Sequence, residues 1–596
     1  MQKYSVNQHL IETILTWVKS GEIAIPEIQR PFVWDSTKVR NLIDSLYQGY
    51  PVGYLISWRN PTIRLKDGTS SEGKKILIDG QQRVTAMTAA ILGQKIIDKS
   101  YRKKRIIISF NPLEERFEVF NPAIEKDSSW IPDISKVVQG EVSMLKVIRD
   151  YCAKNTDANE EEIERVLEKL RSLTKRQLGL IELSGDLDIE TVTEIFVRIN
   201  SQGVVLSQAD FAMSKIASNE KYGGQELRKF IDYFCHLNIA PDFFERISEV
   251  DESFSKGPYL KHIGWLKNEK DDLYDPTYSD VLRVSFTSEF DRGRLADLVG
   301  LLSGRNFETR TYEEEIAEDT YRRLIESVID FVNETSFKRF LMIIKSSGFI
   351  DKQLVRSQNT LNFAYIVYLK LKKLGYAPEQ IERFVRKWFV MSILTGRYSG
   401  SPESGMDFDI KAIVSRGFEN HLEDVEKAEL SDAFWDASLI QSLNTSVASS
   451  PYFNVFLAAQ VMLRDKGFLS REIAITDLIE HRGDIHHLFP RDFLKKQGLK
   501  RGQYNQIANY VYMQSETNIK IGNKSPKDYF ESILAQVENG GMQYGAITNR
   551  DILMENLREN CIPEMILQAE FTDYEAFLQE RRKLMARKIK VYYLNL

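Results

Sequence analysis

The sequence predicts an α+β protein with more than one domain, and three observations lead to this. The chain has 596 residues, several times the ~100–200 residues of a usual domain. Short apolar runs typical of strands alternate with amphipathic helical segments in the first part of the chain. Helical periodicity then dominates from about residue 220 to 395, and a second mixed region follows. We therefore expect domains at 1–215, 216–400 and 401–596, the middle one helical.

The second boundary lies at the segment GRYSGSPESG, residues 396–405, which is rich in Gly, Ser and Pro. Before it, Pro378 opens a predicted helix with a heavy apolar stripe. The stripe consists of Ile381, Phe384, Val385, Trp388 and Phe389. Such a stripe is typical of a core-facing helix and not of a ligand site.

The N-terminal region contains both helix and strand patterns. Apolar residues recur at helical spacing from Ile11 and again from Val39, and the second helix should end at Gly49. The runs 54–58 and 75–78 predict strands, and residues 81–92 predict a helix directly after Asp79-Gly80. Residues 105–110 and 117–120 suggest a hairpin, and 157–160 looks like a capping box before the next helix.

Composition restricts the class of protein. The formal net charge is −5, so any contact with nucleic acid must come from local basic patches. Three cysteines far apart in sequence give neither metal-ligand spacing nor a disulfide framework. The first residues lack a signal-peptide pattern, and no apolar run approaches the ~20 residues of a membrane span. We expect a cytoplasmic protein without a membrane contact.

The C-terminal region holds the densest group of histidines. His481, His486 and His487 are three of the seven histidines, and the last two lie in the string GDIHHLFP. Asn509 and Asn518 follow at short distances in sequence. Phosphodiester hydrolysis needs a base that deprotonates water and a cation that neutralises the phosphate, and a neutral imidazole serves either need. Adjacent residues on a strand point to opposite faces, so joint action of both histidines requires the backbone to bend there.

This order of residues resembles the HNH, or ββα-metal, nucleases. The resemblance implies His487 as the general base, with His486 and Asn518 as ligands of Mg²⁺ or Mn²⁺. It gives Asp484 as an extra ligand and Asn509 as a residue that orients the hairpin or the base. Many relatives have a final His where this chain has Asn518. The alternative interpretation is a surface His pair with two structural asparagines.

A second constellation lies near the N-terminus. The segments Gln29-Arg30, Pro51-Val52-Gly53 and Asp79-Gly80-Gln81-Gln82-Arg83 occur in this order. Gly80 permits close backbone approach, a helix start attracts anions, and Arg83 can bind a phosphate in a bidentate manner. Asp79 could hold a metal ion or a ribose hydroxyl. Taken alone, the last string is a weak signal, and it favours a capped helix with a surface arginine.

Together these segments resemble the N-terminal domain of GmrSD-type restriction proteins. That domain is similar to the ParB/sulfiredoxin-like fold and is associated with NTP binding and hydrolysis. The strings FVRINSQG at 196–203 and RYSGS at 397–401 match the same family. The order of the two halves is that of single-chain members, including SspE-like proteins. By motif position, the nucleotide-site candidates are Gln29, Arg30, Asp79, Gly80, Gln82, Arg83 and Asn200.

Local basic clusters give candidate DNA surfaces. Lys495, Lys496, Lys500 and Arg501 flank the histidines. The run from Arg581 to Lys590 is the strongest cluster, with Tyr592 and Tyr593 beside it for stacking on bases. A solvated helix face is the alternative for each cluster.

The resemblance implies an NTP-regulated, metal-dependent endonuclease that restricts modified phage DNA, with double-stranded DNA and a nucleoside triphosphate as partners. Two rivals stay open: a nucleotide-switched DNA-binding protein with a degenerate nuclease domain, and a non-enzymatic member of a defence complex. The sequence does not distinguish GTP, UTP, CTP and ATP, and it leaves homodimer formation open.

Overall fold

The computed structural model describes residues 3–20, 22–24, 34–58, 75–97, 103–184, 187, 195, 207–219, 221–481 and 483–596. The chain forms two compact units. Unit 1 comprises residues 1–267 and 302–321, and unit 2 comprises 268–301 and 322–596. Helices predominate and the sheets are small, in agreement with the predicted α+β class. Within the described ranges, no helix is both long and apolar enough to cross a membrane.

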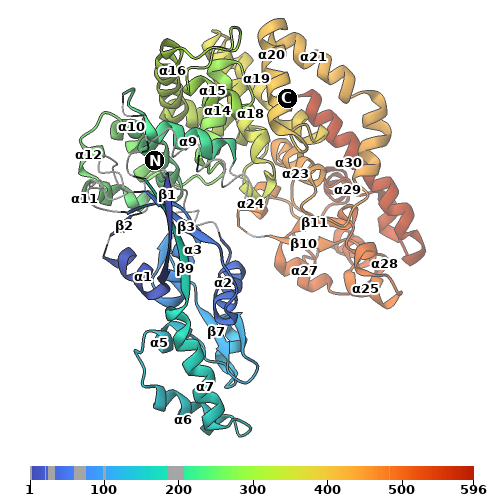
Figure 1. Ribbon diagram of the computed structural model, residues 1–596. Helices are drawn as coiled ribbons and strands as arrows, with labels where there is room; N and C mark the ends of the chain where they lie inside the picture. Colours follow the sequence, from blue (N-terminus) through green and yellow to red (C-terminus); the bar gives the residue numbers. More distant parts are fainter. Residues whose placement is uncertain are drawn as a thin grey trace. The chain divides into compact units, whose positions relative to one another are not determined.

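Unit 1 contains a mixed five-stranded sheet in the order β1-β9-β3-β4-β2 (Figure 1). Its strands are β1 Tyr4–Leu10, β2 Ile23–Ala24, β3 Tyr54–Trp58, β4 Lys75–Asp79 and β9 Gln177–Leu183. The pairs β1–β9 and β3–β4 are antiparallel, whereas β3–β9 and β2–β4 are parallel. The predicted strands at 54–58 and 75–78 are confirmed.

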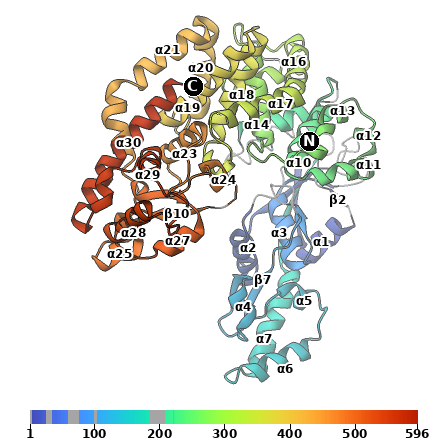
Figure 2. The same ribbon diagram turned by 180° about the vertical axis from the view of Figure 1, so that it is seen from behind.

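Three helices pack with this sheet: α1 Ile11–Lys19, α2 Ser36–Gln48 and α3 Gln81–Ile91. Their apolar faces form one core with Leu55, Leu77 and Leu180 from the strands. Figure 2 shows α1 and α3 next to each other. Asp35 caps α2, and Gly49 ends it in the left-handed region, where glycine carries no steric penalty. All three helices were predicted from the sequence.

The segment between α3 and β9 adds residues to the same core. It contains β5 Ile96–Ile97, β6 Lys103–Lys104, β7 Ile108–Asn111, β8 Arg116–Val119, α4 Pro122–Lys126, α5 Ile134–Val138, α6 Met144–Lys154, α7 Glu160–Arg171 and η1 Ser172–Lys175. The β7–β8 hairpin confirms the prediction for 105–120. The predicted capping box at 157–160 is wrong in one respect. Asn159 is the cap of α7, because its side chain accepts hydrogen bonds from the amides of Glu161 and Glu162.

The next described part of the chain, nearly all of it in unit 1, is helical. Its elements are α9 Gln208–Ser218, α10 Gly224–Ile239, η2 Pro241–Arg246, α11 Ile247–Val250, α12 Glu252–Ser255, α13 Leu260–Ile263 and η3 Gly264–Asn268. The predicted helix at 189–199 lies outside the described residues except for Ile195.

Unit 2 begins with a helical array, except that α16 starts in the part of unit 1 at residues 302–321. The helices that follow in the chain are α14 Tyr278–Phe290, α15 Leu295–Leu302, α16 Glu314–Val332, α17 Glu334–Ser346, η4 Lys352–Leu354, α18 Gln358–Lys373, α19 Pro378–Thr395, α20 Pro402–Arg416, α21 Phe418–Glu429, η5 Phe434–Ser438, α22 Leu439–Ser442 and α23 Pro451–Leu463. The apolar stripe of α19 is buried, as predicted.

The segment 396–405 joins α19 to α20 inside unit 2. Arg397 donates from Nε to the fully buried carboxylate of Asp409 at 2.8 Å, and the Tyr398 hydroxyl donates to the same carboxylate at 2.8 Å. His421 contacts Asp409 as well, at 3.0 Å. The segment is therefore tied to α20, and through Asp409 to α21, both of which follow it in the chain. The division into 1–215, 216–400 and 401–596 stays a prediction.

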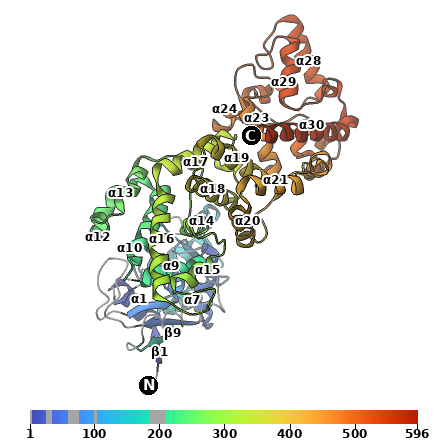
Figure 3. The same ribbon diagram turned by 90° about the horizontal axis from the view of Figure 1, so that it is seen from above.

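The last part of unit 2 combines a small hairpin with helices. Its elements are α24 Ile475–Glu480, β10 Asp484–His487, α25 Arg491–Lys496, α26 Arg501–Tyr504, η6 Ile507–Asn509, β11 Tyr510–Met513, α27 Ser515–Ile521, α28 Pro526–Asn539, α29 Arg550–Glu559, η7 Glu564–Gln568, η8 Phe571–Asp573 and α30 Tyr574–Leu594. In Figure 3 the long helix α30, shown in red, lies beside α23, which it contacts.

Candidate active site

A hairpin and the helix after it carry the predicted nuclease residues. Strand β10 pairs with β11 in antiparallel register from Asp484 opposite Met513 to His487 opposite Tyr510. Helix α27 starts two residues after β11 and carries Asn518. The order strand, strand, helix brings residues 34 positions apart into one place, because Asn518 faces the start of β10.

His486 and Asn518 converge. Nδ1 of His486 lies 2.7 Å from Oδ1 of Asn518, and Nδ2 of Asn518 lies 3.5 Å from Oδ2 of Asp484. Asp484 and His486 share a face of the strand because side chains alternate. Burial lowers the pKa of His486 to about 4, so the ring is neutral at neutral pH. Its Nε2 is buried and has no hydrogen-bond partner among the described residues.

The donor set fits a small hard cation only in part. Among the described residues, no group of three or more His, Cys, Asp or Glu side chains is arranged so that it could hold a metal ion. The candidate set is one imidazole, one carboxylate and one amide oxygen. An amide oxygen only accepts, so Nδ1 of His486 carries the ring proton in its contact with Asn518, and Nε2 is the ring atom whose lone pair could face a cation. A cation held here would keep several water ligands, as Mg²⁺ usually does.

His487 lies on the opposite face and has a separate partner. Its Nε2 is 3.0 Å from Oδ1 of Asn505. Its ring packs against Tyr510 in a T-shaped arrangement, with the ring centroids 4.9 Å apart. An amide oxygen only accepts, so Nε2 must carry the ring proton and Nδ1 keeps the lone pair. Burial lowers the pKa of His487, and the charge of Arg491 lowers it further against the Asn505 hydrogen bond, which raises it. The ring is thus a neutral base at neutral pH.

Asn505 was missed in the sequence. It lies between α26 and η6, in a segment without periodicity, and nothing in its spacing from the histidines distinguishes it from Asn509. Only the fold brings it opposite His487.

Asn509 holds the turn that follows His487. Its Oδ1 accepts from the amide of Phe489 at 2.8 Å, and its Nδ2 donates to the carbonyls of Phe489 and Tyr504 at 3.0 and 3.3 Å. The side chain is fully buried. Asn509 therefore orients the hairpin and the loop, while Asn505 contacts His487.

No bend interrupts β10, contrary to the sequence-based requirement. All four residues from Asp484 to His487 stay in register, so the two histidines point to opposite faces. Among the described residues the sheet has only two strands, so the outer edge of β10 is unpaired. The two rings therefore lie on opposite faces of the hairpin, and the His486 ring is buried.

The two predicted basic clusters differ in exposure. The predicted Lys495, Lys496, Lys500 and Arg501 are exposed on α25, at the N-cap of α26 and on α26, and the structure adds the exposed Arg491 at the start of α25. We call these five side chains the basic patch. Arg491 and Lys495 lie 3.4 and 3.5 Å from Asp492, and these exposed pairs are weak.

The C-terminal run was wrongly predicted as the better DNA surface. Arg581 and Arg582 are buried, Lys588 pairs with the buried Asp465, and the Tyr592 and Tyr593 rings are buried. Helix α30 packs on several sides, so part of its basic side chains point into the protein. Lys583 and Arg587 stay exposed on the outer face of α30, and charge in the sequence does not tell these side chains from the buried ones.

Four of the seven candidate nucleotide-site residues, Asp79, Gly80, Gln82 and Arg83, lie within the described part of unit 1. Gly80 is left-handed at φ +93° and precedes α3, whose first turn has no side-chain cap. Arg83 pairs with Asp79 at 2.7 Å and donates to the carbonyl of Val52 at 3.1 Å. Gln82 is half-buried at the start of the same helix. The segments Pro51-Val52-Gly53 and Asp79–Arg83 thus meet at the guanidinium of Arg83. Gln29, Arg30 and Asn200 lie outside the described residues.

Comparison with known proteins supports the N-terminal half of the resemblance. Residues 11–217 match the family described as the GmrSD restriction endonuclease, N-terminal domain. The predicted resemblance is confirmed for this segment. The chain is also 24% identical, over 640 aligned positions, to an uncharacterized protein of Methanocaldococcus jannaschii. That alignment covers 98% of this chain and 98% of the relative, so the two chains correspond along nearly their whole length.

Gly53 gives a test of the Arg83 arrangement. A Cβ at Gly53 would lie 2.5 Å from Nη1 of Arg83, and the backbone has φ +87°. We expect Gly53→Ala to lower the free energy of unfolding by about 1–2 kcal/mol from backbone strain, plus the loss from displacing Arg83. Gly223→Ala is the matched control in unit 1, because its φ is +73° and its Cβ meets no atom within 4 Å. Equal losses in denaturant titrations would mean that Arg83 is not constrained.

Proposed function

We propose that this protein is a divalent-metal-dependent DNA endonuclease whose activity is regulated by a nucleoside triphosphate. The observation that carries the proposal is the 2.7 Å contact between His486 and Asn518 beside a neutral His487. His486 and Asn518 supply ligand-type groups on one face of β10, and His487 supplies a free ring nitrogen on the other face. A cation site and a base are the two requirements of phosphodiester hydrolysis. The match of residues 11–217 to restriction endonucleases adds DNA as the expected substrate.

His487 is the general base in this proposal. Its Nδ1 takes a proton from water while the water oxygen forms a bond to phosphorus. The bond from phosphorus to the leaving oxygen breaks, and that oxygen takes a proton from solvent. Asn505 keeps the ring proton on Nε2, so that Nδ1 is available throughout.

His486, Asn518 and Asp484 would hold Mg²⁺ or Mn²⁺. The bound cation supplies positive charge beside the scissile phosphate. The protein's own part is to present a neutral imidazole, an amide oxygen and a carboxylate on one side of the hairpin. Asn509 fixes the turn that leads away from His487.

The basic patch is the proposed contact with the DNA backbone. Its five exposed cations follow His487 closely in the chain and lie on two consecutive short helices or, for Lys500, directly before the second one. Contacts to phosphate position a duplex without reading its sequence. Recognition of modified, double-stranded phage DNA is part of the proposal through the restriction resemblance.

Unit 1 is proposed to bind and hydrolyse the nucleotide with Mg²⁺. Asp79, Gly80, Gln82 and Arg83 would contribute, together with Gln29, Arg30 and Asn200. Both terminal nitrogens of Arg83 already have partners, so a phosphate would use the remaining N–H groups or replace the Asp79 pair. Hydrolysis would control the nuclease through the helical region.

The role of His487 is testable by separating two activities. His487→Ala should lower the DNA cleavage rate by about 10²–10⁴-fold, the usual contribution of a general base, and leave NTP turnover unchanged. His481→Ala is the control, because this exposed ring contacts the carbonyl of Asp477 on the helix before the hairpin. Parallel loss of both activities would contradict the two-module proposal. DNA binding without cleavage in the wild type would favour the nucleotide-switched binding protein, and absence of both would favour the non-enzymatic rival.

The cation ligands are testable by direct binding of Mn²⁺. Asn518→Ala should weaken Mn²⁺ binding by at least about 10-fold, since even indirect partners of metal ligands have effects of about 10–100-fold. Asn505→Ala should leave Mn²⁺ affinity unchanged while it slows cleavage, because Asn505 contacts the base on the other face. Titration calorimetry measures both. Unchanged affinity in Asn518→Ala would remove it from the ligand set.

The basic patch is testable through salt dependence. Lys496→Gln with Lys500→Gln should reduce the slope of log affinity against log salt by about 0.9 for each phosphate that the variant no longer neutralises. Lys352→Gln with Lys427→Gln is the control at equal charge, since both lysines are exposed and lie on other elements. Fluorescence anisotropy with a labelled duplex gives the slopes. An equal change in both pairs would mean that only net charge matters.

A further inference from the structure

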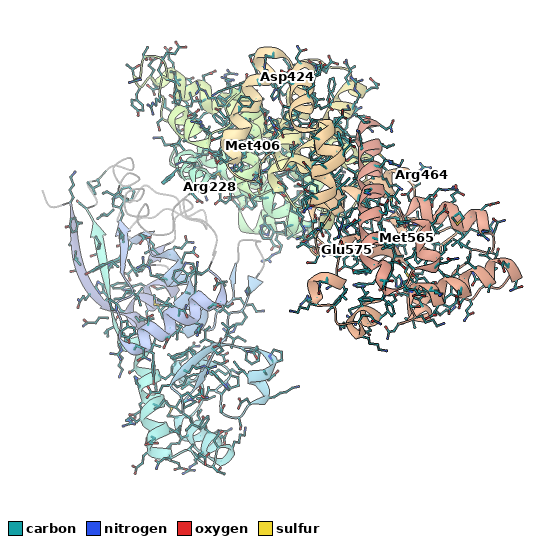
Figure 4. The ribbon with its side chains drawn as sticks, turned by 90° about the vertical axis from the view of Figure 1, so that its right-hand side faces the viewer. Arg228, Met406, Asp424, Arg464, Met565 and Glu575 are labelled. Carbon is teal, nitrogen blue, oxygen red and sulfur yellow. The ribbon has the colours of Figure 1, made fainter. Side chains whose placement is uncertain are left out.

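Helix α30 contacts the segment 503–508 on both sides of Asn505. The Tyr574 hydroxyl donates to the carbonyl of Gln503 at 2.8 Å. Arg582 donates from Nη2 to the side-chain oxygen of Gln506 at 3.3 Å. Arg581 donates from Nη1 to the carbonyl of Ala508 at 2.8 Å. Figure 4 marks Glu575, in the first turn of this helix.

Arg581 is an unusual residue in this position. Its side chain is fully buried, and none of the ion pairs among the described residues includes it. Its second contact is another carbonyl, that of Asn560 at 3.1 Å, and its Nε has no partner among the described residues. Burial lowers the pKa of Arg581 to about 10, which reflects the poor solvation of the cation.

A buried cation without a carboxylate partner loses solvation that nothing replaces in full, so an apolar side chain would suit the core better. A planar guanidinium does what an apolar residue cannot: it fixes two carbonyl oxygens in one plane by directional hydrogen bonds. One of these carbonyls ends α29, and the other belongs to Ala508, just before Asn509. The arginine therefore determines where the segment before β11 lies.

Two hydrogen bonds join residues 503–509 to His487 and to the residue after it. The amide of Leu488 donates to the carbonyl of Asn509 at 2.8 Å, which joins the segment to the end of β10. Asn505 itself faces Nε2 of His487 at 3.0 Å. A shift of residues 503–508 would move the only described side chain that fixes the proton on His487 by an acceptor oxygen. The ring of Phe489 also packs against Tyr574 and Phe577, which adds a contact between α30 and the turn after β10.

We propose that Arg581 is a positioning residue of the candidate nuclease site. It holds residues 503–508 against β10 so that Asn505 keeps the His487 proton on Nε2. This inference rests on the proposed function for its catalytic meaning. The geometric part, the tautomer of His487, does not depend on cleavage.

The first experiment reads the tautomer in the full chain. Long-range ¹H–¹⁵N spectra of ¹⁵N-histidine protein resolve the two ring nitrogens, and seven histidines keep the spectrum simple. His487→Ala assigns the signal. We expect a predominant Nε2–H form in the wild type and a mixture in Arg581→Met. Lys588→Met is the matched control, because it removes a buried cation from the same helix that contacts Asp465 and the Glu559 carbonyl instead of residues 503–508.

An unchanged tautomer in Arg581→Met, or an equal change in Lys588→Met, would overturn the proposal. If Arg581→Met does not fold, Tyr574→Phe replaces it, since this change removes only the hydroxyl bound to Gln503 and Tyr504. The same expectation and the same contrary result then apply to it.

The second experiment tests whether Arg581 acts through Asn505. Arg581→Met and Asn505→Ala should each slow DNA cleavage by about 10–100-fold, and the double variant should be no slower than the slower single one. If the double variant lost activity by the product of the two single effects, Arg581 and Asn505 would act independently, and the proposed connection would be refuted. If the wild type does not cleave DNA, the proposed function fails, while the tautomer measurement still decides the positioning role.

Discussion

Adjacent side chains of a β-strand point to opposite faces, and in β10 this gives His486 and His487 different surroundings. His486 faces Asn518 and Asp484, whereas His487 faces Asn505. The two rings are both neutral because both are buried, yet they have different free nitrogens and partners. In the proposed function, one pair of identical residues thus becomes a ligand and a base. The hairpin register underlies every other feature of the site.

That register needs support from distant parts of the chain, because a two-stranded hairpin is marginally stable alone. Asn509 joins the turn after β10 to Tyr504, and Tyr529 donates to the carbonyl of Leu488 at 2.7 Å. Helix α30 then fixes the intervening loop through Tyr574 and Arg581. Residues from 484 to 581 therefore form one support for the histidines. Polar side chains make most of these connections by binding backbone carbonyls, which is how irregular loops satisfy buried groups.

In unit 1, the position of the Arg83 side chain depends on the glycine at position 53. Gly53 leaves the space that Arg83 fills, and Arg83 joins the turn at Val52 to Asp79. Two motifs that are separate in sequence meet at one guanidinium. The match to GmrSD N-terminal domains covers this region, and the candidate nuclease hairpin lies beyond it.

Local patterns in the sequence determined the helices α1, α2, α3 and α19 and the strands β3 and β4, because apolar spacing and turn residues act over a few positions. The resemblance to HNH nucleases, carried by the order of these residue types in the chain, selected His486, His487 and Asn518 as one group. The tertiary structure alone decided the rest. It brought Asn505 to His487, and it buried Arg581, Arg582 and the two tyrosines that looked like a DNA surface. Exposure and side-chain partners depend on packing between distant segments, and no local pattern records that packing.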